Sequence, residues 1–521
     1  SIAVDASADL IHELATAHPD IEILPDQEIT LQNVSDAGED LPAWNLDRIK
    51  AREAWEIGYR GQGVIVATLD TGVDSKHPDL ITRYRGGTNS WYDPATGSSV
   101  TVELTSGLFA GHGTQVMGVL VGGDASGTPI GVAPEAEFIA AKIFYFDKNS
   151  TKANESDIID GFQWILDPDG DLYTDDSPHI VNNSWDAGSI DSTSCTGEDG
   201  LLHQAVQAVR EAGIFPVFAA GNRQEAVVPA AYPESVAVGG TDINNAIWTE
   251  SVSGDGSGRG TTGCKGRSSY PDLVAPAVNI LTSDWSFGGI VTDTGTIYRT
   301  VTGTSVAAPH IAGAAAIMLS ANPALTLEEL QDSIESTAFG LGDNNVYGKG
   351  LVDIKASLNY MFHNYPPPVK DIHVKNTGPG EFTVSWESSI SAGVLQPEEP
   401  VTYIISRNGT VIADKYRPAY FIDRNLDDSA SYTYSITTVV EGIAGKHARA
   451  LLGNINDANE ITGNRVDAFD LAAMMNVFGA SCPTSGGCSG NWNGAADLNG
   501  DNIINDADIA ILLAHFGQVI K

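Results

Sequence analysis

A buried helix is predicted to begin within the segment Gly303-Thr304-Ser305-Val306-Ala307-Ala308-Pro309-His310, because an apolar run from Ile311 to Leu319 follows it. The segment presents the hydroxyl group of Ser305 just before that run. A serine in this place lies at the positive end of the helix dipole, where negative charge developing on a substrate oxygen is stabilised. Most serines and threonines there only cap their helix. The segment therefore indicates a nucleophile only if the chain also supplies a base and a carboxylate.

Two upstream segments supply those groups. Asp70 ends the apolar run Gly63–Asp70 and precedes a Thr-Gly turn, so its carboxylate is expected at the carboxyl end of a strand, where open α/β sheets bind ligands. His112 lies between two glycines where an apolar helix begins. Nucleophilic catalysis needs a serine beside a base, and a carboxylate that fixes the tautomer of that base. Asp70, His112 and Ser305 are thus catalytic candidates, and the alternative for Asp70 is a structural residue that caps its turn.

The region from Leu41 to about Tyr360 alternates between strand and helix patterns. Its strand segments are continuous apolar runs, as in a parallel sheet that is buried on both faces. We therefore predict an α/β domain, a parallel sheet covered by helices on both sides, over residues 41–362. The expected strands are 63–70, 136–143, 180–184, 215–220 and 235–239, and the expected helices are 157–166, 200–211 and 309–321.

The three candidate residues lie in motifs that resemble those of a known family. Asp70-Thr-Gly, His112-Gly-Thr and the segment around Ser305 resemble, in this order, the three signatures of the subtilisin-like serine proteases, the subtilase family. Asn183-Ser-Trp185 is similar to the bacillopeptidase-F-like members. The resemblance implies a subtilisin-like fold in which Ser305 is the nucleophile, His112 acts as general base and then acid, and Asp70 orients His112.

The resemblance also points to groups that hold the substrate. Asn222 follows the expected strand 215–220 and matches the asparagine of the family's oxyanion hole, although without the other motifs it would be taken for an ordinary turn residue. The family pairs the substrate backbone with an edge segment as an added β-strand. The matching substrate-binding residues are Ser184, Trp185 and Asp186 on one wall and Ala219, Ala220 and Gly221 on the other.

Asp186 stands where the family often has glycine. A carboxylate there either favours Lys or Arg before the scissile bond, or is solvated at the rim of the pocket and selects nothing. Both interpretations stay open at the level of the sequence.

Residues 1–40 are similar to the end of the inhibitory propeptide of this family. We expect self-cleavage within Gln32–Leu41, and the alternative is an ordinary N-terminal extension. Ser1 is not an initiator Met and no signal-type segment follows it, so we expect that the start has been trimmed or omitted. In the same family resemblance, His77-Pro-Asp79-Leu matches a segment whose aspartate ligates a structural Ca²⁺, but the other ligands are not clear in Gly122–Gly131.

A proline-rich linker at Tyr365-Pro-Pro-Pro separates the α/β region from a region of short alternating runs. No helical pattern interrupts residues 366–450, which predicts a β-sandwich with Trp386, Tyr403 and Tyr434 in its core. This sandwich resembles a fibronectin type III domain, which implies a spacer or a binding platform.

The segment 453–521 contains two copies of a loop followed by an apolar helix, with Asp470 and Asp508 at the same place in each. The second loop has the ligand spacing of a calcium loop, although Asn502 stands for glycine and Asp508 for glutamate. It resembles a type I dockerin, which implies a cohesin-like or cell-surface partner. The alternative is a solvated acidic turn, and the first copy has a defective ligand set. The expected Ca²⁺ ligands are Asp497, Asn499, Asp501, Ile503, Asn505 and Asp508.

Composition bounds the class of protein. The 521 residues suffice for two or three domains, and the net charge of −39 argues against a nucleic-acid partner, which requires a basic face. No run reaches the length of a membrane span, and we expect a monomer. The four cysteines predict disulfides in an oxidising compartment, with Cys482–Cys488 as a local pair and Cys195–Cys264 as the other candidate.

We therefore expect a secreted serine endopeptidase, held at a surface or in a complex by its C-terminal modules, that hydrolyses extracellular proteins for nutrition. A processing protease that cuts few sites is the first alternative. A non-catalytic protein that binds peptides for adhesion is the second.

Overall fold

The structure is a computed structural model that describes residues 6–18, 23, 26–30, 35–36, 43–97, 103, 109–147, 150–171, 174–188, 200–222, 226–251, 269–286, 297–390, 401–427 and 432–451. It divides into two compact units, residues 1–320 with 325–358, and residues 321–324 with 359–521. The predictions on 453–521, including its six Ca²⁺ ligands, and on Cys195, Cys264, Cys482 and Cys488 lie outside the described residues.

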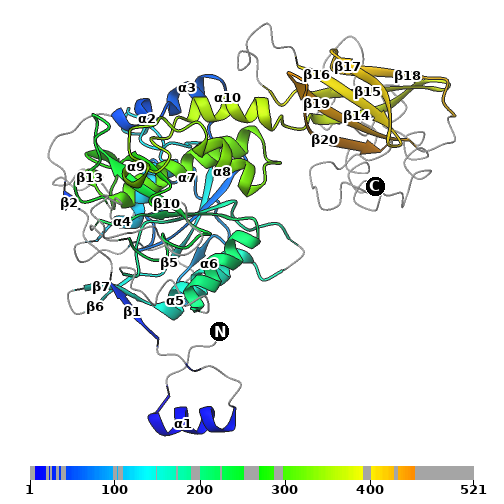
Figure 1. Cartoon of the computed structure of the whole chain (residues 1–521). Helices are drawn as coiled ribbons and strands as arrows, with labels where there is room; N and C mark the ends of the chain where they lie inside the picture. Colours follow the sequence, from blue (N-terminus) through cyan, green and yellow to red (C-terminus); the bar gives the residue numbers. More distant parts are fainter. Residues whose placement is uncertain are drawn as a thin grey trace. The chain divides into compact units, whose positions relative to one another are not determined.

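A seven-stranded sheet forms the centre of the first unit, with the strand order β11-β10-β9-β8-β3-β5-β4 (Figure 1). Every neighbouring pair runs parallel, which confirms the predicted parallel sheet. The chain leaves β3 to form β5 on one side and later β8 on the other, so the end of β3 lies at a switch point, where open sheets bind ligands. The strands are β3 (Ile65–Asp70), β4 (Trp91–Tyr92), β5 (Glu137–Lys142), β8 (Ile180–Asn183), β9 (Phe215–Ala219), β10 (Val236–Thr241) and β11 (Leu273–Pro276).

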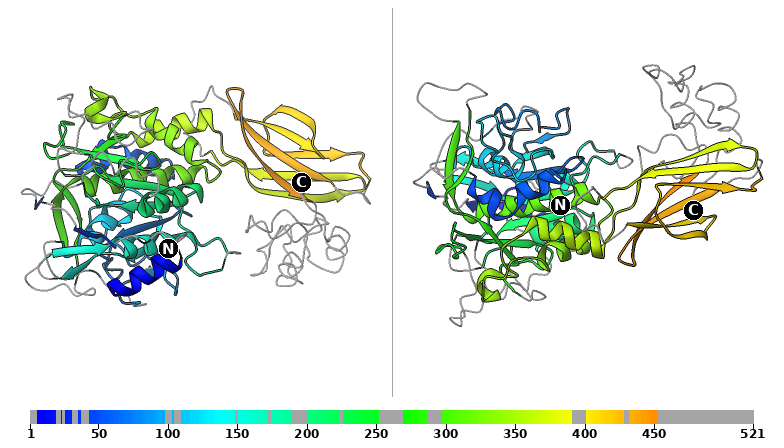
Figure 2. Two further views of the ribbon diagram at one scale, coloured as in Figure 1. Left: turned by 60° about the horizontal axis from the view of Figure 1, so that its bottom comes forward. Right: turned by 90° about the horizontal axis from the view of Figure 1, so that it is seen from above.

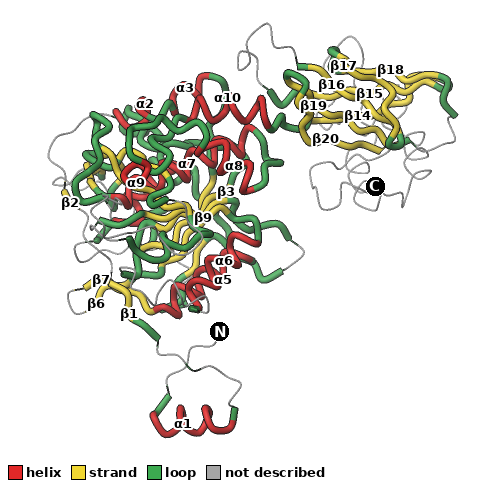
Figure 3. The backbone as a smooth tube through the Cα atoms, viewed as in Figure 1, coloured by secondary structure: helices red, strands yellow, loops and turns green. Residues whose placement is uncertain are grey.

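Helices cover both faces of this sheet (Figure 3). Helices α5 (Glu155–Leu166) and α6 (Leu201–Glu211) pack their apolar sides on one face, in a core that includes Leu69 of β3 and Phe218 of β9. Helices α4 (His112–Val121) and α7 (Thr304–Ala321) cover the other face. Alternate residues of β3 point to opposite faces, so Leu69 lies on the α5 side and Asp70 on the side of α4.

Helix α7 begins at Thr304, earlier than the predicted start at Pro309. Proline lacks an N–H group, so the carbonyl of the residue four positions earlier, Ser305, has no intrahelical donor. The hydroxyl group of Ser184 donates to that carbonyl at 2.7 Å, which lets the helix pass through Pro309. Among the described residues, α7 is the one helix apolar enough to span a membrane by composition (mean hydropathy 1.3), and it is entirely buried.

The remaining elements of the first unit surround this core. Two small antiparallel sheets include strands from the N-terminal region, in the orders β1-β7-β6 and β12-β13-β2. Their strands are β1 (Glu28–Thr30), β2 (Ser35–Asp36), β6 (Tyr145–Asp147), β7 (Ser150–Asn154), β12 (Ile280–Ser283) and β13 (Tyr298–Thr302). The other helices are α1 (Ala8–Ala17), α2 (Trp44–Arg48), α3 (Ala51–Glu56), α8 (Leu327–Glu335) and α9 (Asn344–Tyr347), and α10 (Ile354–Asn364) leads into the second unit.

The second unit contains two antiparallel sheets, β14-β15-β18 and β17-β16-β19-β20, drawn in yellow to orange in Figure 2. One apolar core joins their inner faces, and Trp386, Tyr403 and Tyr434 are buried in it, as predicted. The rings of Trp386 and Tyr403 meet edge to face at 5.1 Å. The strands are β14 (Lys370–Gly378), β15 (Glu381–Glu387), β16 (Thr402–Arg407), β17 (Thr410–Tyr416), β18 (Tyr420–Arg424), β19 (Thr433–Val440) and β20 (Ile443–Leu451).

Candidate active site

Asp70 and His112 form a buried hydrogen-bonded pair. Asp70 is the last residue of β3 and His112 the first of α4, and His112 Nδ1 lies 2.8 Å from Asp70 Oδ1. The exposed fractions of the two residues are 0% and 2%. Because an ionised carboxylate only accepts hydrogen bonds, the imidazole proton lies on Nδ1 and donates to Asp70. Nε2 of His112 therefore carries the lone pair that a general base requires.

The charge of Asp70 determines the basicity of His112. Burial opposes a charged imidazole, but the charge of Asp70, its hydrogen bond and the charge of Glu103 outweigh this effect and raise the pKa of His112 above its ordinary value. The imidazolium that proton abstraction would form is thus stabilised in place.

The glycines around His112 allow helix α4 to approach the end of β3. A Cβ atom on Gly113 would lie 1.9 Å from the carbonyl oxygen of Gly72, so no other residue fits there without a shift of the backbone. Gly111 has a φ of 84°, in the left-handed region that favours glycine. The Gly-His-Gly pattern is therefore required by the close packing of the helix on the Asp70 turn.

Ser305 lies in the first turn of α7, with 3% of its surface exposed. Within the described part of the chain, neither Ser305 Oγ nor His112 Nε2 has a hydrogen-bond partner, although both atoms are buried. These are the two atoms that a serine–histidine pair joins, and such bonds are often long before substrate binds. Each atom therefore retains its capacity to form a hydrogen bond.

Asn222 is bound to the residue that precedes Ser305. Its side-chain oxygen accepts hydrogen bonds from the backbone N–H of Thr304 at 2.9 Å and from the Thr304 hydroxyl group at 2.7 Å. Because a backbone N–H can only donate, the amide oxygen must face α7, and the NH₂ group is the opposite end of the amide. The orientation of the Asn222 donor is thus fixed relative to Ser305.

A small pocket adjoins Ser305, and most of the predicted substrate-binding residues line it. Ala220 does not: it is buried in the core, and its carbonyl accepts a hydrogen bond from Tyr270 at 2.6 Å. The ring of Trp185 is also directed into the core, where its Nε1 donates to the carbonyl of Leu69 at 2.9 Å. The lining residues are Ser184, Trp185, Asp186, Ala219, Gly221, Asn222, Thr304 and Ser305.

Asp186 is buried in this pocket, with an exposed fraction of 5%. Its Oδ1 accepts the backbone N–H of Gly188 at 3.1 Å, which fixes the carboxylate on its own turn. The carboxylate is thus largely shielded from solvent, and its selection of a basic side chain stays a prediction.

The two carboxylate oxygens of Asp79, the expected calcium ligand, have different surroundings. Its Oδ1 accepts the backbone N–H of Ala125 at 2.6 Å, while Oδ2 is buried and has no hydrogen-bond partner among the described residues. Burial and the nearby Asp79 carboxylate raise the pKa of Tyr298, so this phenol lies close to the same group. Ca²⁺ takes six to eight oxygen ligands, and the contacts described here supply one open oxygen. They do not by themselves form a calcium site.

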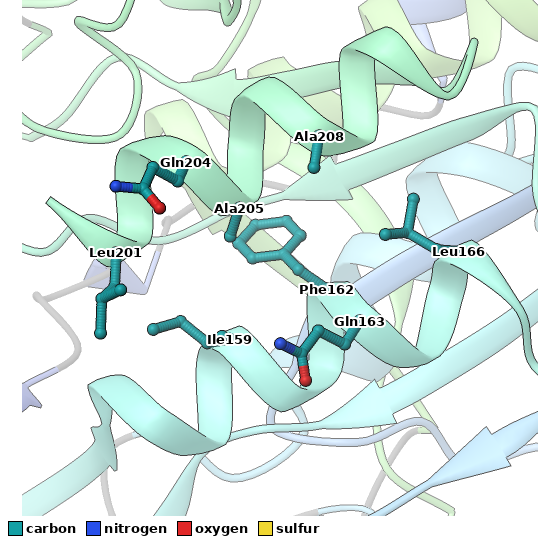
Figure 4. Close-up of a pocket in the computed structure, with 8 residues that line it drawn as sticks. All are labelled: Ile159, Phe162, Gln163, Leu166, Leu201, Gln204, Ala205 and Ala208. Carbon is teal, nitrogen blue, oxygen red and sulfur yellow. The ribbon is translucent and has the colours of Figure 1, made fainter. Parts of the chain in front are cut away.

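In a second acidic group, Asp167, Asp169 and Asp176 bring one carboxylate oxygen each within 4.8 Å of one another, and only Asp169 is exposed. A separate apolar hollow of about 250 Å³ lies between α5 and α6 (Figure 4). Phe162 of α5 and Ala205 of α6 are among the residues that line it, and none of the lining side chains carries a charge. Neither feature contains a residue of the Asp70–His112–Ser305 group.

Sequence reasoning did not identify Glu103, which is buried beside the Asp70–His112 pair and bonded to Thr71 and Thr114. It also missed His310, whose two ring nitrogens are bonded to Asn45 and to the carbonyl of Val306 at the start of α7. Glu103 lies in no apolar pattern, so no signal in the sequence points to it. His310 stands inside the quoted motif and could have been recognised as a buried polar residue of a core helix.

Comparisons with known proteins identify the family of this chain. Residues 61–350 match the model of the Subtilase family, Peptidase_S8. Bacillopeptidase F of Bacillus subtilis (strain 168) is 35% identical over 397 residues, which cover 68% of this chain and 25% of that protein. Subtilisin Savinase of Lederbergia lenta is 34% identical over 316 residues, which cover 60% of this chain and 97% of that protein. M-protease of Shouchella clausii (strain KSM-K16) is 33% identical, with 60% and 69% covered.

Proposed function

Since the chain belongs to the subtilase family and its relatives indicate a serine endopeptidase, we propose that it hydrolyses extracellular proteins through Asp70, His112 and Ser305. The match spans a quarter of bacillopeptidase F, so the proposal concerns the peptidase unit that the two proteins share. The hydrogen bond of 2.8 Å between the buried side chains of His112 and Asp70 is the observation that carries it.

In the proposed reaction, each of these groups has one role. His112 Nε2 takes the proton of Ser305 Oγ as that oxygen attacks the peptide carbonyl, and Asp70 stabilises the imidazolium that results. The NH₂ group of Asn222 and the backbone N–H of Ser305 donate to the oxyanion, and losing one such donor typically costs ~10²–10³ in rate. His112 then protonates the leaving amine, and a water molecule, activated by the same nitrogen, releases the acyl group.

A phosphonate ester that reacts with activated serines tests this function against the alternative of a protein that only binds peptides. We expect labelling of Ser305, located by mass spectrometry of the digested protein, and none in Ser305→Ala. Ser320→Ala is the matched control, because it removes a hydroxyl group from the same helix outside the site. A wild-type protein that stays unlabelled would support peptide binding without hydrolysis.

The N-terminal region fits the proposed role of a propeptide tail. Asp26 accepts hydrogen bonds from the backbone and the hydroxyl group of Ser156 at the start of α5. Strand β1 pairs with β7, and β2 pairs with β13, the strand that leads directly into Thr304 and Ser305. The region is thus bound to the peptidase unit on both sides of Gln32, which supports self-cleavage within Gln32–Leu41.

A processing protease is a second candidate function, and the burial of Asp186 in the pocket favours it. A buried carboxylate in a substrate pocket attracts a Lys or Arg side chain, which would restrict cleavage to a few sites. The alternative of broad nutritional hydrolysis requires that Asp186 remain bound to its own turn when substrate enters. The two functions differ in the residue that precedes the cleaved bond.

We also propose roles for the C-terminal regions, for Asp79 and for the cysteines. The second unit, with its two antiparallel sheets, would act as a fibronectin type III-like spacer, and segment 453–521 as a dockerin-like module that binds Ca²⁺ and a cohesin-like or cell-surface partner. Asp79 would supply one oxygen to a structural Ca²⁺, and no step of the reaction passes through that ion. The cysteine pairs would form in the extracellular compartment, where the protein would act as a monomer.

A further inference from the structure

The side chain of Glu103 bridges the two segments that supply Asp70 and His112. Its Oε1 accepts the hydroxyl group of Thr71, the residue after Asp70, at 2.7 Å. Its Oε2 accepts both the backbone N–H and the hydroxyl group of Thr114, at 2.8 and 2.6 Å. Only 3% of Glu103 is exposed, so these bonds hold a buried carboxylate.

Glu103 also accepts a hydrogen bond from a backbone N–H group in the first turn of helix α4. The N-cap residue, Gly111, has no side chain, and the structure gives α4 no side-chain cap from its own N-terminus. Instead, Glu103 accepts the N–H of Thr114, and the hydroxyl oxygen of Thr71 accepts the N–H of Gly113 at 2.9 Å. An acidic group at this end of a helix is favoured by the helix dipole. Because α4 begins at His112, these bonds fix the imidazole relative to Asp70.

The directions of the hydrogen bonds match an ionised Glu103. The Thr71 hydroxyl oxygen accepts Gly113 N–H, and that of Thr114 accepts Asp74 N–H at 2.9 Å, so each hydroxyl proton is left to point at Glu103. With the N–H of Thr114, three donors among the described residues point at the two carboxylate oxygens. If Glu103 were protonated, its proton would have to share a carboxylate or threonine oxygen that already accepts a hydrogen bond. The arrangement therefore places a second negative charge near His112, besides that of Asp70.

We propose that Glu103 is a positioning residue of this peptidase, which joins the Asp70 turn to the His112 helix and whose charge supports the imidazolium formed on His112. The inference rests on the proposed roles of Asp70, His112 and Ser305. Glu103 touches neither the substrate pocket nor Ser305 in the described contacts, so it acts through its neighbours.

The electrostatics of the site agree with this role. The charge of Glu103 is one of the groups that raise the pKa of His112. Burial raises the pKa of Glu103 itself to about 7, against its bonds from Thr114 and Thr71 and together with the charge of Asp70. Protonation of Glu103 removes a charge that raises the pKa of His112, so the acidic limb of activity depends on both groups.

Two other carboxylates approach the same helix from neighbouring segments. Asp74, after β3, accepts the backbone N–H of Ser286 at 3.0 Å. Asp284, after β12, accepts the side-chain amide of Gln115 at 3.0 Å. Neither is among the groups that shift the pKa of His112, which makes Asp74 a suitable control.

The test is the pH dependence of kcat/KM for a peptide substrate. Glu103→Gln keeps the size of the side chain and removes the charge, so the acidic limb is expected to move to lower pH by about half a unit to one unit, and to become less steep. KM is expected to change little, and kcat to fall about tenfold as the His112–Asp70 geometry loosens. Asp74→Asn, which neutralises a buried carboxylate that accepts the backbone N–H of Ser286, is expected to keep the wild-type acidic limb.

Glu103→Asp provides a second, charge-preserving measurement. Because the charge remains, the acidic limb of kcat/KM is expected to stay near that of the wild type. The value of kcat is expected to fall, because the shorter side chain cannot reach both threonines. An unshifted limb in Glu103→Gln, or a shift in Glu103→Asp as large as in Glu103→Gln, overturns the inference. A wild-type protein that is inactive and unlabelled at Ser305 overturns the proposed function instead, so the two failures are distinguishable.

Discussion

The hydroxyl group of Ser184 donates a hydrogen bond of 2.7 Å to the carbonyl oxygen of Ser305, the atom that Pro309 leaves without an intrahelical donor. Ser184 also lines the pocket beside Ser305. One side chain therefore stabilises the interrupted turn of α7 and joins the pocket wall to the nucleophile.

Replacing Ser184 by alanine would leave a buried carbonyl oxygen unsatisfied, which typically costs about 1–3 kcal/mol. We expect a decrease of this size in the free energy of unfolding in urea, measured in a Ser305→Ala background to prevent self-digestion. Ser320→Ala is the matched control, because Ser320 donates to a carbonyl in the regular part of the same helix at 2.7 Å. Equal losses in the two variants would contradict the special role of the Ser184 bond.

The stability of the peptidase unit is expected to depend on His310. Its Nδ1–H donates to the carbonyl of Val306 at 2.7 Å, so Nε2 accepts from Asn45 at 2.9 Å, and burial lowers the pKa of this neutral ring to about 4 from 6.5. Between these values the unfolded chain binds the proton and the folded chain does not, so stability is lost as the pH falls. The free energy of unfolding is expected to fall by roughly 3 kcal/mol between pH 6.5 and pH 4 for this reason.

The measurement compares urea unfolding at pH 7.5 and pH 4.5 in Ser305→Ala and in Ser305→Ala with His310→Gln. The second protein is expected to be less stable at the higher pH and to lose less on acidification. The same pH dependence in both proteins would show that His310 does not contribute to acid sensitivity.

How far the sequence alone predicts this site depends on how local each signal is. Asp70 was predicted because the strand before it is a continuous apolar run, and His112 because glycines flank it; both signals lie within a few neighbouring residues. The subtilisin-like fold followed from these motifs and agrees with the parallel sheet. Glu103 bonds to a threonine 32 residues away, and no local pattern in the sequence encodes a contact over that separation.

The direction of side chains was also beyond the sequence. Trp185 belongs to a segment that lines the pocket, but its ring packs on Phe218 and its N–H on Leu69, because the core behind the strand offers a large apolar space. Asp186 was expected to be either selective or solvated, and only the structure shows that it is buried.

Self-cleavage is expected to remove the N-terminal region. The wild-type chain should yield a new N-terminus within Gln32–Leu41, and Ser305→Ala should keep residues 1–40, because only an activated Ser305 can cut the segment that β2 holds against β13. N-terminal sequencing and intact mass of both proteins, expressed in parallel, give the answer. Processing of the Ser305→Ala protein at the same bond would assign the cut to another protease.

The role of Asp186 is open to a direct test with peptides that differ only in the residue before the cleaved bond. If the pocket selects basic residues, Asp186→Asn should lower kcat/KM for the Lys and Arg peptides by about 10- to 100-fold, since it removes one charge from the buried pair of Asp186 and the substrate side chain. The values of kcat/KM for the Leu and Phe peptides should stay nearly unchanged. A wild-type enzyme that cuts all four peptides equally well would contradict selection by Asp186 and favour broad hydrolysis.

The most direct measurement is the hydrolysis of casein by the wild-type chain beside its Ser305→Ala variant, purified in the same way and assayed with calcium present. The account predicts cleavage by the wild-type protein and a loss of at least about a thousandfold in the variant, because the nucleophile is removed while the pocket and the Asp70–His112 pair remain. Equal activity of the two proteins would show that Ser305 is not the nucleophile and would contradict the central claim.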